Sequence, residues 1–103
     1  MQLLPKALKK LIPPMGSQEE CEDPILHVKF FTPDGGWTWY VVEGEPLPDR
    51  DYLFYGYVIG AEPEWGNFTL SELQSVRGKF NLPVERELWF EPTPFSVIEK
   101  RGY

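Results

Sequence analysis

The segment ILHVKFFTPDGGWTWYVV, residues 25–42, carries the strongest structural signal in this chain. Two runs rich in β-branched and aromatic residues, 25–32 and 37–42, flank the turn sequence Pro33-Asp34-Gly35-Gly36. Such residues favour the extended backbone of a strand, and a short turn rich in Pro, Asp and Gly joins antiparallel neighbours. The segment therefore predicts a β-hairpin.

The residues that follow the hairpin predict more strands. Residues 43–51 contain two prolines and several charged side chains, so we expect a polar loop there. Residues 52–60 and 67–69 are again rich in aromatic and branched residues and are expected to form strands, as is the run 87–91.

Three helices are predicted. Residues 4–12 place leucine and isoleucine on one side and three lysines on the other, and the prolines at 13 and 14 end this amphipathic helix. Thr69-Leu70-Ser71-Glu72 matches a capping box, which predicts a helix that ends near Gly78, with Leu73, Val76 and Phe80 on its apolar side. Thr93-Pro94 is expected to cap a final helical turn that runs through Ile98.

This order of elements favours an α+β fold: a small antiparallel β-sheet of four to five strands, with an N-terminal helix and one internal helix packed on one of its faces. With 103 residues, the chain has room for a single domain, 1–103. We divide it into an N-terminal helix with an acidic connector, 1–24, and the sheet with its internal helix, 25–103.

Charge is distributed unevenly. The net charge is −6, but residues 19–75 hold 12 acidic side chains against only Lys29 and Arg50. A segment so poor in basic residues is unsuited to neutralising phosphates, which argues against direct nucleic-acid binding and favours a basic protein surface as partner. With one cysteine, no apolar signal segment and no membrane-length apolar run, the sequence predicts a cytoplasmic protein with no membrane association.

Catalytic and metal-binding patterns are weak. His27 and Cys21 are the only residues of their kinds, and we interpret both as structural, although an enzyme that uses His27 with carboxylates stays an alternative. Asp49-Arg50-Asp51 lacks the further ligands of a calcium loop, and Glu62 and Glu64 are more typical of a solvated turn than of an acid–base pair. We therefore expect no enzymatic activity, no cofactor and no metal.

The aromatic residues allow two interpretations. Six of them lie on expected strands: Trp37, Trp39, Tyr40, Phe54, Tyr55 and Tyr57. The first interpretation is a hydrophobic core, because a small domain needs large side chains to bury. The alternative is a platform on which the bases of a single-stranded nucleic acid stack, helped by Lys29 and Arg77.

The chain resembles a family of small bacterial proteins of unknown function, a DUF family carried on plasmids, phages and conjugative elements. The resemblance covers nearly the whole chain and rests on six segments of its sequence: KFFTPD (29–34), WTWY (37–40), FYGYVIG (54–60), EWGNF (64–68), SEL (71–73) and LPVER (82–86). It implies no activity and no catalytic residues. It does imply a setting in which small acidic proteins counter host defence.

Together, these observations predict a non-enzymatic protein-interaction module of a mobile element. Its acidic side chains would imitate the phosphates of DNA and inhibit a host defence nuclease complex, as anti-CRISPR and antirestriction proteins do. The expected contact residues are six acids and one aromatic residue: Asp34, Asp49, Asp51, Glu62, Glu64, Trp65 and Glu72.

Overall fold

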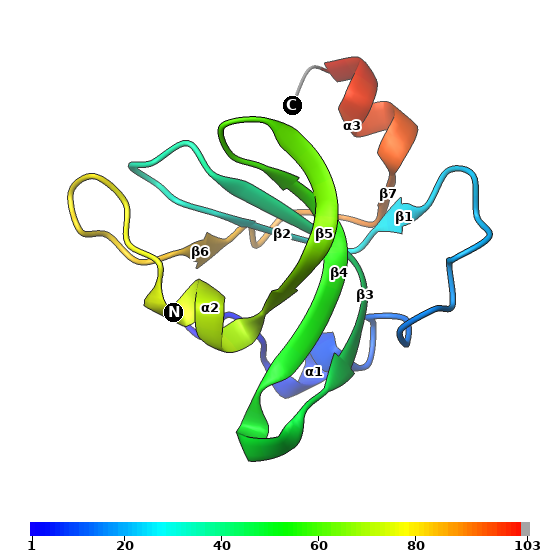
Figure 1. Ribbon diagram of the computed structural model, residues 1–103, viewed down its shortest axis with the longest axis horizontal. Coiled ribbons are helices and arrows are strands. Elements are labelled where there is room, and N and C mark those ends of the chain that lie inside the picture. Colours follow the sequence, from blue (N-terminus) through cyan, green and yellow to red (C-terminus); the bar gives the residue numbers. More distant parts are fainter. Residues whose placement is uncertain (102–103) are drawn as a thin grey trace.

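The predicted hairpin lies inside a five-stranded antiparallel sheet (Figure 1). This architecture comes from a computed structural model that describes residues 1–101, so the last two residues of the expected domain lie outside the described part. Hairpin pairing runs from Val28 opposite Val41 to Phe31 opposite Thr38. The strand order is β5-β4-β3-β2-β6, with the bounds β2 Val28–Phe31, β3 Thr38–Pro46, β4 Tyr52–Ile59, β5 Pro63–Thr69 and β6 Glu85–Arg86.

Short elements complete the α+β fold. A second, two-stranded antiparallel sheet pairs β1 (Ile25–Leu26) with β7 (Thr93–Pro94). The helices are α1 (Lys6–Lys9), a 3-10 turn (Pro48–Arg50), α2 (Leu70–Ser75) and α3 (Phe95–Arg101). The fold class, with its N-terminal and internal helices, is confirmed.

The first face of the main sheet is covered over its central part. It includes Phe30 and Phe54, both 0% exposed, together with Trp39, Val41 and Phe68. The Phe54 ring contacts three other rings, at centroid distances of 5.8 Å to Phe30, 5.3 Å to Tyr52 and 5.4 Å to Phe68. The side chains that cover this face come from the N-terminal segment, α2 and the loop before β6: Leu3, Leu4, Ile12, Leu73 and Val84.

The second face is covered only in part. Tyr40, Val42 and Tyr57 are buried there against Leu26 of β1 and Ile98 of α3. The expectation that the helices pack on one face was therefore wrong for α3, which lies on the opposite side from α2 (Figure 1). The physical reason is that large apolar side chains occur at both parities of β3 and β4, so both faces need cover.

Strand β3 continues to Pro46, beyond its expected end at Val42, so the predicted loop 43–51 begins only at residue 47. The register with β4 shifts: Val41 pairs with Gly56, and Glu43 pairs with Tyr55. Strict alternation would turn Glu43 into the core of the first face, whereas the extra residue in this β-bulge turns it to the second face.

The N-cap half of the expected capping box is confirmed at the start of α2, whereas the Glu72 carboxylate accepts from the Thr69 hydroxyl at 3.1 Å instead of from the Thr69 amide. The amide of Glu72 donates to the Thr69 hydroxyl at 3.2 Å, and Thr69 is the N-cap residue. The helix ends at Ser75 rather than near Gly78, because Val76 has extended backbone. Phe80, expected on the apolar side of this helix, lies in the following loop and is 73% exposed.

Three other boundaries differ from expectation. The N-terminal helix is limited to α1, because the buried leucines before it and Ile12 after it reach the core from non-helical backbone. Strand β5 begins at Pro63 instead of residue 67, and α3 continues to Arg101. The strand expected at 87–91 is wrong: strand pairing with β2 is limited to Glu85–Arg86, and a turn at residues 88–89 then brings Phe90 onto the second face beside Tyr40.

Candidate functional site

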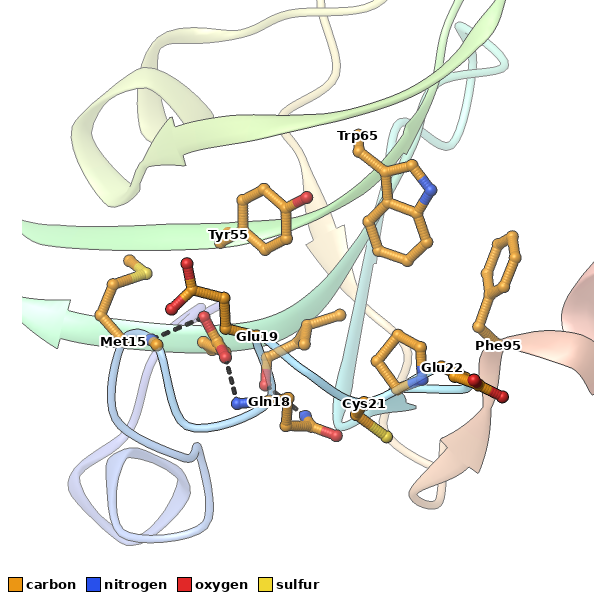
Figure 2. Close-up of a pocket in the computed structure, with 12 residues that line it drawn as sticks. Met15, Gln18, Glu19, Cys21, Glu22, Tyr55, Trp65 and Phe95 are labelled. Atoms are coloured by element: carbon orange, nitrogen blue, oxygen red, sulfur yellow. Dashed lines mark hydrogen bonds between the residues drawn. The ribbon is translucent and has the colours of Figure 1, made fainter.

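A groove of about 710 Å³ lies on the second face, between the sheet and the acidic connector, residues 15–24 (Figure 2). One wall carries aromatic side chains of β4, β5 and α3, and the opposite wall is the connector. The floor includes Val42 and Glu43 from the bulge. Its principal lining residues are Gln18, Glu19, Glu22, Tyr55, Trp65 and Phe95.

The aromatic wall is a continuous row of rings. Tyr55 stacks on Trp65 with centroids 6.0 Å apart and planes 16° apart. Trp65 in turn contacts Phe95 at 4.8 Å, so α3 extends the row that the two strands begin. Trp65 is 38% exposed, which leaves part of its ring available to a ligand. Figure 2 shows these three side chains on the side of the groove opposite Glu19 and Glu22.

The connector is fixed to the sheet by Glu43. This carboxylate is only 4% exposed and accepts hydrogen bonds from two connector amides, Gly16 at 2.8 Å and Gln18 at 2.5 Å. A buried carboxylate is tolerated when amide donors satisfy its oxygens. The bulge that turns Glu43 to this face therefore determines where the connector lies.

Near the beginning of the connector, the side chain of Gln18 forms hydrogen bonds with the backbone of two strands. Its amide nitrogen donates to the carbonyls of Ile25 and Val42, both at 3.1 Å, and its carbonyl accepts from the Ile25 amide at 2.9 Å. One side chain thus joins the connector, β1 and β3 through their backbone groups.

The other end of the connector is attached to α3. Asp23 accepts from the Ser96 amide at 2.8 Å and from the Ser96 hydroxyl at 2.7 Å, and the Phe95 amide donates to Pro24 at 2.9 Å. The Ser96 hydroxyl, followed by the Ser96 amide, holds the pKa of Asp23 below its ordinary value. Both ends of the connector are therefore anchored, and the groove between them is preformed.

The seven predicted contact residues occupy two ends of the sheet. Asp34 lies in the β2–β3 turn, and Glu62, Glu64 and Trp65 lie in or next to the β4–β5 turn at the same end. Asp34 is engaged within the fold, because its Oδ2 accepts from the amides of Phe80 and Leu82. Glu62 and Glu64 are exposed, and of the seven only Trp65 lines the groove.

The remaining three residues lie at the other end of β4, about 25 Å along the strand. Asp51 accepts from the Ser71 hydroxyl at 2.7 Å and from the Ser71 amide at 3.0 Å, and these bonds, the hydroxyl's first, lower its pKa. Glu72 belongs to the capping box, and Asp49 is exposed. The structure does not gather the seven residues into one patch.

The two residues with side chains typical of catalysis, His27 and Cys21, differ in their surroundings. The backbone amide of His27 donates to Val41 at 2.7 Å, and burial lowers the pKa of its half-buried imidazole. Cys21 is exposed on the groove rim. Within residues 1–101, no three side chains of the metal-binding types cluster together, and no helix is long and apolar enough to cross a bilayer.

A second hollow, of about 480 Å³, lies beside the β2–β3 turn. Trp37 is 44% exposed and stacks on Trp39 with centroids 5.8 Å apart. Arg77 and Lys79 line the same hollow. Lys29, the other basic residue of the single-strand alternative, lies 5.8 Å from the Tyr40 ring on the second face, so it does not belong to this group.

The sequence indicates Trp65 as a contact residue and Tyr55 as a candidate platform residue, but it does not reveal the groove that they share. The connector acids contribute only to the charge pattern, and the sequence alone assigns no role to Glu43 or Gln18. A carboxylate that directly follows the apolar run WYVV was the one available signal, because alternation would place it in the core.

Comparison with known proteins places nearly the whole chain in one family. Residues 3–99 match a family model described as a protein of unknown function (DUF2958). The chain belongs to the DUF2958 family. The resemblance to a family of unknown function is thereby confirmed. No curated protein and no solved structure matches this DUF2958 chain, so its function has to be argued from the groove.

Proposed function

We propose that this DUF2958 protein is a non-enzymatic interaction module that binds a basic surface of another protein. The observation that carries the proposal is the preformed groove, which combines a partly exposed aromatic wall with the exposed carboxylates of Glu19 and Glu22. Interfaces concentrate their binding energy in large aromatic side chains surrounded by polar residues. Carboxylates around them select a positively charged partner and accelerate its approach.

The partner that we propose is a nucleic-acid-binding or nuclease complex of host defence, which the protein inhibits in the cytoplasm. Surfaces that hold DNA or RNA are rich in lysine and arginine. The connector presents Glu19 and Glu22 at the groove, and a basic surface held there would be withheld from phosphates. The resemblance to proteins of mobile elements supplies the biological setting.

Inhibition of DNA cleavage tests this proposal. Purified protein would be titrated into reactions of a restriction endonuclease and of a CRISPR effector nuclease. We expect inhibition of one class, weakened by added salt because the contact is electrostatic. The double variant Glu19→Lys/Glu22→Lys should abolish it. A double variant at exposed positions outside the groove, Glu45→Lys/Glu91→Lys, makes the same change in net charge and should retain inhibition.

Two outcomes would contradict the proposal. Undiminished cleavage by both nucleases at excess protein would remove the inhibitor role. Equal loss of inhibition in both double variants would show that net charge, rather than the groove, is responsible. Reversal of Glu62 and Glu64 in a third variant shows whether the β4–β5 turn adds to the contact.

A second candidate function is binding of single-stranded nucleic acid in the hollow beside the β2–β3 turn. The favouring observation is the juxtaposition of the exposed Trp37 with Arg77 and Lys79. Rings stack on bases, and basic side chains follow the phosphates. Titration of oligothymidylate at low salt should quench tryptophan fluorescence, and Trp37→Leu should remove the quenching. An unchanged fluorescence signal would exclude this function.

A further inference from the structure

We propose that the groove receives an arginine side chain from an extended basic segment of the partner, with the guanidinium group between the aromatic wall and the connector carboxylates. This inference rests on the proposed function and specifies which partner group the groove recognises. It follows from three properties of the groove: the exposed Trp65 ring, the carboxylates opposite it, and the fixed position of both walls.

The aromatic wall suits a planar cation. A guanidinium group stacks on the face of tryptophan or tyrosine, where the ring quadrupole attracts positive charge. Trp65 is supported on both sides, by Tyr55 at 6.0 Å and by Phe95 at 4.8 Å, so its ring keeps its orientation before a ligand arrives. A lysine ammonium lacks the flat surface that would use this ring fully.

The connector supplies the opposite charge. Glu19 and Glu22 line the groove and are exposed, and their carboxylates take part in none of the hydrogen bonds or ion pairs described for residues 1–101. A carboxylate can accept two parallel hydrogen bonds from one guanidinium group. Figure 2 places Glu19 and Glu22 along the wall that faces Tyr55, Trp65 and Phe95, so a side chain that enters between the walls meets both kinds of group.

The groove is ordered before binding. Glu43 fixes the beginning of the connector, and Asp23 fixes its end to Ser96. Binding therefore does not have to order a flexible loop, and the entropy cost of association is reduced. A preformed slot of this kind favours an extended segment, which can insert a single long side chain, over a flat protein surface.

Peptide binding provides the test. The probes are three nine-residue peptides of the pattern GXGGXGGXG, in which X is arginine, lysine or glutamate, and affinity is measured by isothermal titration calorimetry at low salt. We expect the arginine peptide to bind tightest and the glutamate peptide not to bind. Trp65→Leu should lower the affinity for the arginine peptide about tenfold. Trp89→Leu, at a position that is 88% exposed and outside the groove, should leave binding unchanged.

A second variant guards against misfolding of Trp65→Leu. Glu19→Gln/Glu22→Gln changes only exposed side chains. It should lower the affinity for the arginine peptide severalfold and make that affinity less dependent on salt. Equal affinity for the lysine and arginine peptides, or binding that is insensitive to both variants, would overturn the inference. Displacement of the peptide by oligothymidylate would also overturn it. In each case the cleavage assay still decides the proposed function separately, because a partner could be inhibited through other contacts.

Discussion

The two faces of the main sheet differ in how completely they are covered, although the same strands form both. On the first face, side chains from the N-terminal segment, α2 and Val84 bury Phe30 and Phe54 fully. On the second face, α3 and the connector leave a groove and an exposed Trp65. The comparison indicates that the first face supplies most of the stability and that the second face is available for binding.

The strongest test of this division compares neighbouring residues of β4. Phe54→Ala removes a ring that is 0% exposed on the first face, and we expect a loss of about 3–5 kcal/mol of unfolding free energy. Tyr55→Ala, on the groove side, should cost about 1 kcal/mol. Urea denaturation of both variants measures the difference. Similar losses would show that the two faces share the stability equally.

Glu43→Gln tests whether the connector can be released without unfolding the first face. Gly16 and Gln18 donate to different oxygens of the carboxylate, whereas glutamine has one acceptor oxygen, so one of the two hydrogen bonds is lost and we expect a loss of about 2 kcal/mol. Hydrogen exchange should accelerate in residues 16–24 and stay slow in β4. Glu45→Gln, at an exposed position of the same strand, is the control. Uniform acceleration over the whole chain would mean that the two regions are not independent.

Thr69→Ala probes the cover of the first face. Loss of the hydroxyl that accepts from the Glu72 amide should destabilise the protein by about 1 kcal/mol. Gln74→Ala, an exposed substitution in the same helix, should change stability by less than about 0.5 kcal/mol. Thermal unfolding of the two variants measures this contrast. Thr69→Ala should also leave the affinity for the arginine peptide unchanged. That result would show that stability of the first face and binding at the second face are independent.

The smallest expected effect is a dependence of stability on pH through His27. Burial holds the pKa of its imidazole in the folded chain below the ordinary value of 6.5. As the pH falls below 6.5, the unfolded chain therefore binds a proton first, and stability decreases until the pH has passed the folded pKa. Thermal unfolding between about pH 5 and about pH 8 should show this decrease in the native protein, and His27→Gln should reduce it. The pKa values of Asp23 and Asp51 are lowered from the ordinary value of 3.8, so their titration changes stability only at pH values below the range of this measurement.

Local signals in the sequence predicted the central elements well. The hairpin, β4 and the capping box of α2 each depend on residues close together in the chain, such as Thr69 and Glu72. Alternation and turn chemistry are therefore sufficient to identify them. The α+β class followed from their order along the chain.

Long-range contacts determined what the sequence did not reveal. Strand β3 reaches Pro46 because the bulge and the amides of Gly16 and Gln18 accommodate Glu43, and those partners are 25 or more residues away. The groove depends on the same contacts. A charged residue inside an apolar pattern ordinarily marks the end of a strand, so local reasoning ended β3 at Val42.

The bulge in β3 also determines how this strand tolerates a change in length. Deletion of Val42 would remove the bulge and let Glu43 follow Val41 directly, so simple alternation would keep the carboxylate on the second face, opposite Tyr55. If the residue stayed but the bulge were lost, Glu43 would instead lie opposite Phe54, in the layer that holds Phe30 and Phe54. Among DUF2958 chains, the carboxylate can therefore anchor the connector without the extra residue, but where the extra residue is present the anchor requires the bulge.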